Sequence, residues 1–306
     1  MIHNVRVRNY LGEEMVMELR NPEKSGFLVF NMTGIGPEKA ELRMTDIVTA
    51  DGGIYNSSRL PSRNIVMSVR FFSWEDKTVE EIRHESYKYF PIKKPLTLFI
   101  ETDNRIGEIV GYVEANEPVI FSRETHTQLS IVCPFPYFYD GSADGNNITA
   151  FSGVEPLFEF PFSNESLTEP LLIMGSIQVH AEGVVVYSGD SEVGVVITIE
   201  ALGPARNITL NKVDTRERMF INTTKLQQMT GSGIVAADSI IITTIKGRKS
   251  IFLLRQGRLT NILNTLDKGA DWFQLAKGDN LFAFEAEEGI ENLVFRIENR
   301  TLFEGV

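Results

Sequence analysis

The stretch CPFPYFYD, residues 133–140, decides how the chain is divided. Pro134 and Pro136 hold the backbone extended and cannot donate hydrogen bonds inside a sheet. The polar, glycine-rich segment DGSADGNN follows at 140–147, and this composition is typical of a turn. A chain of 306 residues is long enough for two domains. We therefore expect a first domain over residues 1–135, a hinge over 136–145 and a second domain over 146–306.

The hinge assignment rests on five residues: Cys133, Pro134, Phe135, Pro136 and Tyr137. The aromatic rings can pin a stiff proline segment against one or both domains. Cys133 is the only cysteine, which excludes an intramolecular disulfide. A nucleophilic thiol would need a nearby base, and the closest histidine in sequence, His126, lies seven residues upstream. A buried structural thiol is the preferred interpretation, with a reactive thiol as the alternative.

The dominant local pattern on both sides of this stretch is the β-strand. Short, alternating runs such as NIVMSVRFF (64–72) and PLTLFIET (95–102) are separated by glycine and asparagine turns. This spacing favours β-sandwiches or barrels, and hence a mainly β fold. One segment, SWEDKTVEEIRHESYKYFP (73–91), has helical periodicity instead, with Thr78 and Glu81 as a capping box and Pro91 as its stop. The first domain is thus predicted to contain one helix.

Composition and motifs argue against nucleic-acid binding, metal or cofactor sites and catalysis. The 41 acidic and 30 basic residues give a net charge of -11, which is wrong for a protein that grips nucleic acid by its phosphates. No His/Cys pair has zinc spacing. Residues 140–151 are similar to a calcium loop at Asp140 and Asp144, but Phe151 stands where a glutamate ligand is required. TGIGP (33–37) lacks the third glycine of a dinucleotide fingerprint. We expect no catalytic, metal or cofactor site, no membrane span and no enzyme activity.

Arg59 and Arg63 lie in SRLPSRN (58–64), which has the composition of an exposed loop. Arginine suits contacts with acidic groups of a neighbouring subunit, so both are candidate subunit-interface residues. The alternative is a solvated loop without a partner.

The order and spacing of several segments carry a family resemblance: TGIGP (33–37), SRNI (62–65), CPFPYF (133–138), KGRKS (246–250) and WFQLAKGDN (272–280). With the strands between them, they resemble the distal tail protein family of bacteriophages with long non-contractile tails, over nearly the whole chain. One departure is Phe135, which stands between the prolines where the family often has an acidic residue.

The resemblance implies a structural role. Members form a six-fold hub ring at the tail tip or baseplate, with a tail-tube-like N-terminal domain around a central channel and a galectin-like C-terminal β-sandwich. The implied partners are further copies of the chain, the tail tube, the tape-measure protein, the tail-tip hub and, in many phages, receptor-binding proteins. DNA would pass through the channel without specific binding. The implied location is the virion tail tip, assembled in the host cytoplasm, with no membrane insertion.

Two other functions compete with this reading. The galectin-like domain suggests a carbohydrate-binding module that attaches the virion to cell-wall sugars. The residues available for such a site, His180, Arg206, Asn207 and Trp272, do not assemble into a convincing galectin pattern from sequence alone. A hydrolase acting on the host envelope ranks last, because no nucleophile, base or metal motif marks it.

Overall fold

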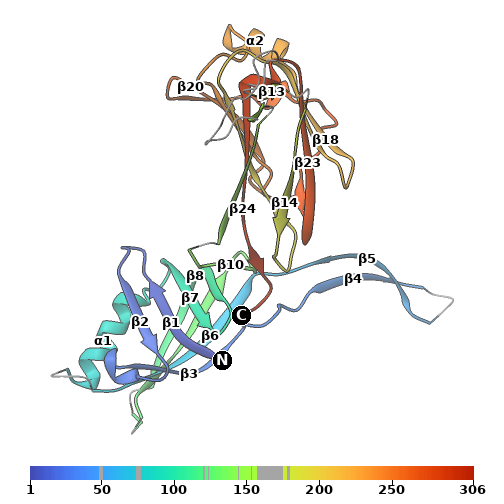
Figure 1. Cartoon of the computed structure of the whole chain (residues 1–306). Helices are drawn as coiled ribbons and strands as arrows, with labels where there is room; N and C mark the ends of the chain where they lie inside the picture. Colours follow the sequence, from blue (N-terminus) through green and yellow to red (C-terminus); the bar gives the residue numbers. More distant parts are fainter. Residues whose placement is uncertain are drawn as a thin grey trace, which may run out of the picture. The chain divides into compact units, whose positions relative to one another are not determined.

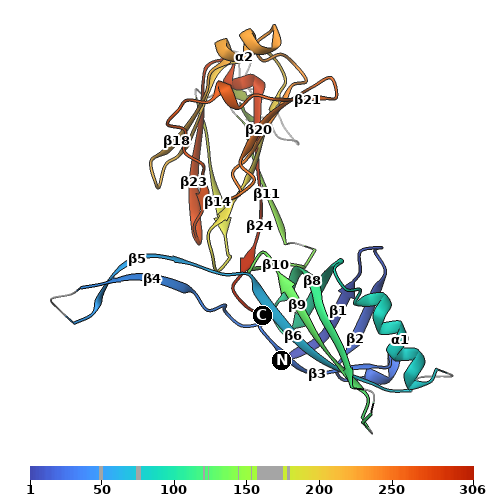
Figure 2. The same cartoon turned by 180° about the vertical axis from the view of Figure 1, so that it is seen from behind.

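The chain folds into two compact units, each with its own core. Unit 1 contains Met1–Gly145 and Leu302–Val306, and unit 2 contains Asn146–Thr301. The computed structural model describes residues 1–47, 51–73, 77–119, 121–122, 124–143, 145–152, 154–156, 175–177 and 180–306. Figures 1 and 2 show the fold from two sides. Both units are built mainly from antiparallel strands, so the predicted mainly β fold is confirmed.

Unit 1 is organised around a nine-stranded antiparallel sheet in the order β2-β1-β7-β8-β9-β6-β3, with β10 attached to β8 and β25 attached to β10. Its regular elements, with the separate pair β4 and β5, are β1 (Ile2–Arg8), β2 (Glu14–Glu18), η1 (Pro22–Lys24), β3 (Phe27–Thr33), β4 (Glu41–Asp46), β5 (Gly53–Arg59), β6 (Arg63–Phe71), α1 (Val79–Tyr89), β7 (Pro95–Thr102), β8 (Ile106–Val119), β9 (His126–Cys133), β10 (Phe138–Asp140) and β25 (Leu302–Phe303).

The long strand β8 joins two parts of this sheet. Its first half pairs with β7 as far as Tyr112, and its second half, from Tyr112 on, pairs with β9. A bulge at Val113 to Ala115 lies just beyond this change of partner. Gly111 is required there, because a Cβ atom would lie 2.6 Å from the Ile131 side chain and 2.9 Å from the Cys133 sulfur. The strand therefore bends where its neighbours leave no room for a side chain.

Alternating residues of these strands make the core of unit 1. Val5, Leu98, Met67 and Leu129 come from four different strands and are all fully buried. Helix α1 contributes Ile82 and begins with the predicted capping box, in which Thr78 and Glu81 bond reciprocally. The predicted helix is thus confirmed, together with its start.

Unit 2 contains a six-stranded sheet, β11-β24-β16-β19-β20-β21, and a four-stranded sheet, β14-β23-β17-β18. Phe284 of β23 stacks on Phe295 of β24 with 4.3 Å between ring centroids, so the two sheets pack face to face. The elements are β11 (Asn146–Ser152), β12 (Val154–Pro156), β13 (Gly175–Ile177), β14 (His180–Tyr187), β15 (Val193–Gly194), β16 (Val196–Ala201), β17 (Arg206–Lys212), β18 (Glu217–Ile221), α2 (Thr223–Thr230), β19 (Ser239–Thr243), β20 (Ser250–Arg255), β21 (Arg258–Asn261), η2 (Leu263–Thr265), β22 (Gln274–Leu275), β23 (Gly278–Glu288), η3 (Ile290–Asn292) and β24 (Leu293–Arg300).

The observed division differs from the expected one in two places. Residues 136–145 belong to unit 1, because β10 pairs with β8 and places Phe138 in the core. The last five residues also return to unit 1, where β25 pairs with β10. Sequence patterns assign each residue to its neighbours along the chain, so a terminal strand that crosses back is invisible to them.

Candidate functional site

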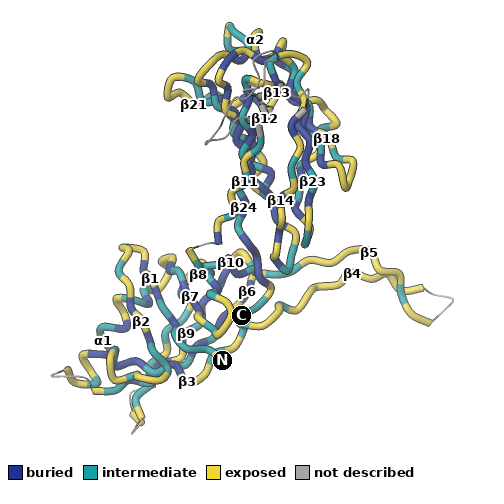
Figure 3. The backbone as a smooth tube through the Cα atoms, viewed as in Figure 1, coloured by how far each residue is buried: buried dark blue, intermediate teal, exposed yellow. Residues whose placement is uncertain are grey.

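The most unusual feature of unit 1 is a two-stranded arm formed by β4 and β5. These strands pair only with each other, and every residue of both except Gly53 is exposed. The arm leaves the main sheet and extends away from it, as Figure 1 shows, and Figure 3 marks it as exposed along its length. A two-stranded ribbon without a core is only marginally stable in water. The arm therefore has no core of its own, and its side chains are exposed to solvent.

The two faces of the arm differ in chemistry. Strand pairing places Met44 opposite Tyr55, and Leu42 lies two residues from Met44 on the same face. These three side chains are 61%, 57% and 56% exposed for Leu42, Met44 and Tyr55 respectively. They form the apolar face of the arm, and Tyr55 is held on it by a 2.8 Å hydrogen bond from its hydroxyl to the Ser58 hydroxyl.

The opposite face is mostly polar. Arg59 and Glu41 face each other across the strands and form an ion pair at 2.7 Å. The amide of Asn56 donates to the Thr45 hydroxyl at 2.6 Å, and Ile54 is the one apolar residue on this face. The arm is thus amphipathic, with period-two alternation but no core on its apolar side.

Arg63 lies at the base of the arm, as the first residue of β6, and is 1% exposed. Its guanidinium donates four hydrogen bonds to backbone oxygens. Nη1 reaches Gly34 O at 2.7 Å and Gly36 O at 2.5 Å, Nε reaches Pro136 O at 2.6 Å, and Nη2 reaches Glu304 O at 2.7 Å. The planar fork of arginine is what allows one side chain to satisfy four acceptors in different directions.

These four oxygens come from three separate segments of unit 1: the approach to β4, the residues after β9 and the C-terminus. The nearest carboxylate oxygen, on Glu38, is 3.9 Å from Nε. Burial lowers the pKa of Arg63, but arginine remains charged in proteins. A buried cation is therefore held mainly by carbonyl dipoles. Only glycine fits at position 34. Its φ is +80°, and a Cβ atom there would lie 2.1 Å from the Asn64 backbone oxygen.

The two candidate interface arginines thus lie in different environments. Arg63 is not in an exposed loop as expected. It is enclosed by its own unit, because the TGIGP segment and the C-terminus fold over it, so it cannot contact a neighbour. Arg59 is exposed on the arm, and its contact with another subunit stays a prediction.

Cys133 is fully buried at the end of β9, as expected of a structural thiol. Burial raises the pKa of Cys133 to about 12, which keeps the thiol protonated and unreactive. His126 is the first residue of β9 and Cys133 the last, so six residues of extended strand lie between them. The residues beyond Cys133 belong to unit 1, and their role as a hinge stays a prediction. Pro136 accepts a hydrogen bond from Arg63, and the rings of Phe135 and Tyr139 stack at 5.4 Å within unit 1.

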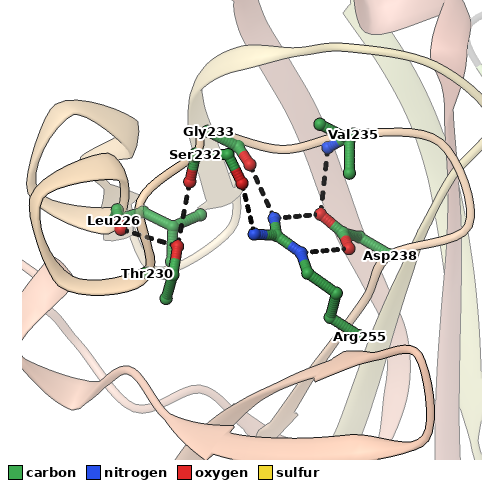
Figure 4. Close-up of polar contacts among 7 residues, drawn as sticks. All are labelled: Leu226, Thr230, Ser232, Gly233, Val235, Asp238 and Arg255. Carbon is green, nitrogen blue, oxygen red and sulfur yellow. Dashed lines mark hydrogen bonds and ion pairs between the residues drawn. The ribbon is translucent and has the colours of Figure 1, made fainter.

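Unit 2 contains a second arginine whose guanidinium makes several hydrogen bonds, and Figure 4 shows it in close-up. Arg255 binds both carboxylate oxygens of Asp238, at 2.8 and 2.6 Å, and also Ser232 Oγ and Gly233 O. Asp238 Oδ2 accepts in addition from Val235 N, so the pair fixes the loop that follows α2. The Asp238 carboxylate raises the pKa of Arg255. Helix α2 was not predicted, although its Asn222 cap and the left-handed Gly231 at its end are sequence signals for one.

Beside this loop lies a hollow of about 440 Å³, lined by Arg206, Thr224, Gln227, Glu288 and their neighbours. Arg206 is already paired with Glu287 and Glu288 at 3.2 and 2.9 Å. Asn207 donates to Glu287, and the ring of Trp272 lies 5.5 Å from Lys249 Nζ. The side chain of His180 lies outside the described residues. Arg206, Asn207 and Trp272 each therefore contact a charged side chain of their own unit.

The described residues contain no group of three or more His, Cys, Asp or Glu side chains placed to hold a metal ion. In the calcium-like segment, Asp140 accepts from Ser142 N at 2.9 Å, and Asp144 lies outside the described residues. No helix in the described part of the chain is long and apolar enough to cross a membrane.

Comparison with known proteins gives structural matches alone. No family model matches the chain, and no curated protein matches its sequence. The chain is similar to the crystal structure of the Dit protein (gp 19.1) of phage SPP1, described as a paradigm of the hub adsorption apparatus in phages infecting Gram-positive bacteria. The TM-score is 0.62 at 12% identity, and the match covers 96% of this chain and 98% of that chain.

This likeness shows a shared fold. Chains of the phage P2 baseplate in its activated conformation match more weakly. The TM-score is 0.46 at 9% identity with Ca, covering 98% and 99% of the two chains, and 0.45 at 8% identity with Sr, covering 97% and 98%. The fold of the SPP1 Dit protein thus extends over both units of this chain.

Proposed function

We propose that this chain is a structural component of a phage tail tip. Copies of it form a hexameric hub ring whose central channel joins the tail tube to the tail-tip hub and the host-attachment proteins. The fold shared with the SPP1 Dit protein over 96% of the chain supports the class. The observation that carries the proposal is the arm, because an amphipathic ribbon with no core of its own needs a partner chain.

The geometry of the arm favours a closed ring of identical chains. Its apolar face is present once in each chain. A contact between this face and a different surface on the next copy is heterologous, and heterologous contacts close into rings when the rotation between copies closes. Arg59 lies on the opposite, polar face of the arm, where it is exposed and available to acidic groups of a neighbour.

The charge balance suits a channel that DNA passes through. A net charge of -11 gives the chain no excess of cations with which to hold a polyanion. In this role the tape-measure protein and then DNA move through the ring, and no catalytic step is required of the chain.

The test is a pair of substitutions matched in exposure on the two faces of the arm. Met44 and Ile54 are each 57% exposed, and they lie on opposite faces. We expect Met44→Ser to reduce ring formation at least 10-fold, since it removes apolar area from the contact, and Ile54→Ser to reduce it less than 2-fold. Native mass spectrometry and electron microscopy of the full chain, assembled with its tail partners, measure the rings.

Both variants are expected to unfold at the same temperature as the parent, because each replaces an exposed side chain of the arm. A parent chain that remains monomeric both alone and in assembled tails contradicts the proposal. Equal ring formation by both variants contradicts the role of the arm.

A carbohydrate-binding module is the second candidate, favoured by the polar hollow beside α2 in unit 2. Hydroxyl, amide and carboxylate groups of the kinds that line it bind sugar hydroxyls in proteins. Glycan arrays of cell-wall polysaccharides, probed with the full chain, decide this function. Binding that is lost in Gln227→Ala supports this function, and the absence of binding to every polysaccharide on the array contradicts it.

A further inference from the structure

The turn that joins β19 to β20 in unit 2 carries three cations. Lys246, Arg248 and Lys249 fall within four residues and are all exposed, although the chain as a whole has a net charge of -11. Lys246 approaches the carboxylate of Glu192 only at 3.8 Å. Among the described residues, the side chains of Arg248 and Lys249 form no ion pair and no hydrogen bond. Three positive charges are therefore presented to solvent on one short turn.

Trp272 lies beside these cations and adds an aromatic surface to them. Lys249 Nζ is 5.5 Å from the centroid of the Trp272 ring, so two segments that are distant in sequence, KGRKS (246–250) and WFQLAKGDN (272–280), meet here. Trp272 is partly exposed, whereas Phe273 is fully buried and packs edge-on against Phe282 with 5.8 Å between ring centroids. The buried neighbour anchors the backbone at Trp272 and keeps the indole beside the turn.

The backbone of this turn is fixed from behind. Gln274 Nε2 donates to Thr244 O at 3.0 Å. Thr244 N donates to Val195 O at 2.9 Å, and Thr244 Oγ1 accepts from Val195 N at 2.8 Å. Gly194 leaves room for the turn, because a Cβ atom there would lie 2.5 Å from Ile245 Cα. A turn held in this way does not have to be ordered when a ligand binds, so less of the binding free energy is lost.

The residue types define the ligand that this surface fits. Arginine and lysine bind phosphate and carboxylate groups, arginine through its planar fork and lysine as a point charge. The face of an indole packs against flat, weakly polar surfaces, such as the C–H face of a sugar ring. An anionic polysaccharide offers both groups in one repeat unit, a sugar ring and a negative charge.

The charge around the turn argues against denser polyanions. Duplex DNA carries one negative charge per about 1.7 Å of its axis, and proteins that hold it use a broad basic face. Here the cations are confined to one turn, with Glu192 beside Lys246 and Asp271 directly before Trp272. DNA or a run of acidic residues would bring further negative charges against these carboxylates. A polysaccharide with one charge per repeat unit brings fewer.

We infer that Lys246, Arg248, Lys249 and Trp272 form a binding surface for an anionic polysaccharide, with a sugar ring on the indole and a phosphate or carboxylate group on the cations. This surface, the cationic turn, shares no residue with the hollow beside α2. It lies within unit 2 and does not depend on the proposed ring.

Binding of the full chain to four immobilised polymers tests the ligand class. The probes are glucose-bearing poly(glycerol phosphate), polygalacturonate, neutral dextran and single-stranded DNA, each measured by biolayer interferometry over a range of ionic strength. We expect one or both anionic polysaccharides to bind at least 10-fold more tightly than dextran and the DNA. Their affinity should fall as salt is added, since salt screens the contacts of exposed charges.

Two double variants matched in charge locate the site. Arg248→Gln with Lys249→Gln should weaken binding at least 10-fold and reduce its dependence on salt. Arg258→Gln with Lys225→Gln removes the same charges from exposed positions of unit 2 outside the turn and should change affinity less than 2-fold. Both should keep the parent unfolding temperature, because each replaces exposed side chains. Trp272→Leu should weaken binding and leave the dependence on salt unchanged, because it removes the ring and no charge.

Each contrary result has a definite meaning. A parent chain that binds none of the polymers, or binds dextran or the DNA as tightly as the anionic polysaccharides, overturns the inference. Equal losses in the two double variants overturn the site. Binding that is lost in Gln227→Ala but kept in Arg248→Gln with Lys249→Gln assigns the polysaccharide to the hollow beside α2 and overturns the site as well. None of these measurements involves ring formation, so the proposed hub is tested independently.

Discussion

Arg59 and Arg63 are four residues apart and belong to two opposite kinds of surface. Arg59 lies on the arm, exposed, with a single carboxylate partner in Glu41. Arg63 lies at the base of the arm, buried, with four backbone oxygens around it. The difference shows where unit 1 is complete and where it is not. The Arg63 guanidinium at the base is satisfied within the chain, whereas the side chains of the arm are exposed to solvent.

Arg255 of unit 2 sharpens this contrast. It is fixed by a carboxylate on a nearby loop, Asp238, whose side chain is 1% exposed. Arg63 instead draws its acceptors from segments as distant as Gly34 and Glu304. A carboxylate pair fixes one loop locally, while the carbonyl cluster ties together the approach to the arm and the C-terminus. The stability of the arm's base therefore depends on the last residues of the chain.

Removing residues 302–306 is expected to have the largest effect. Leu302 and Phe303 are 3% and 7% exposed in the core of unit 1, and Glu304 supplies one acceptor to Arg63. Losing two buried side chains and this hydrogen bond should lower the free energy of unfolding of unit 1 by about 5 kcal/mol or more. Hydrogen exchange of β6 and β10 amides measures the loss.

Unit 2 provides the internal reference for this truncation. Its amides should exchange at the parent rate, because residues 302–306 lie outside it. Unchanged protection of unit 1 after truncation would mean that β25 contributes nothing to its core.

Arg63→Met is expected to cause the second-largest loss in the free energy of unfolding. Methionine fills similar volume but donates nothing, so up to four buried carbonyl oxygens lose their partner. Such losses cost about 1–3 kcal/mol each where water does not replace the donor, and we expect a total of about 3–5 kcal/mol. Chemical denaturation of the full chain, followed by hydrogen exchange at residues 63–71, measures it.

Arg59→Met is the matched control, with the same substitution four residues away. A loss below 1 kcal/mol for Arg63→Met would show that the carbonyl cluster does not hold the base of the arm.

Much of this architecture could be predicted from the sequence, and the exceptions are instructive. Alternation and turn residues placed most strands of unit 1, and the Thr78–Glu81 pair marked the start of α1, because both signals are local. The return of Leu302–Phe303 to unit 1 could not be predicted, since no local pattern reports a partner more than 160 residues away. Helix α2 could have been found from Asn222 and Gly231, but the surrounding strands dominated the interpretation.

The candidate site divides in the same way. Arg59 and Arg63 have similar surroundings in the sequence, because each follows a serine in the same short segment. Only the fold distinguishes them, by closing TGIGP and the C-terminus over Arg63. The arm itself has ordinary strand composition, and its apolar face reads as a core face until the structure shows that no core lies beneath it.

The burial of Cys133 in unit 1 predicts a pH dependence of the free energy of unfolding. Its pKa is raised from 9.0 to about 12 in the folded chain. Below pH 9 the thiol is protonated in both states and its contribution to stability is complete. Above pH 9 the unfolded chain releases this proton first, so the free energy of unfolding should fall by up to about 1.4 kcal/mol per pH unit until pH 12.

Comparing the parent with Cys133→Ala isolates this contribution, because the variant lacks the titrating group. Denaturation curves at pH 8 and pH 10 should differ more for the parent, by about 1 kcal/mol. Folded parent should also resist alkylation at pH 8 and react once unfolded. Rapid alkylation of the folded chain would contradict the closed packing around Cys133.

Arg59→Ala is expected to have the smallest effect on stability and the most selective effect on assembly. The Arg59–Glu41 pair is exposed on both sides, and such pairs contribute about 0–1 kcal/mol, so the unfolding temperature should be nearly unchanged. Ring formation should fall and become less dependent on salt, since one charged contact between copies is lost. Titration of ring formation against ionic strength measures this, with Glu41→Ala as its counterpart. A variant that assembles as the parent does at every ionic strength would assign Arg59 to a solvated surface, and the arm would then act through its apolar face alone.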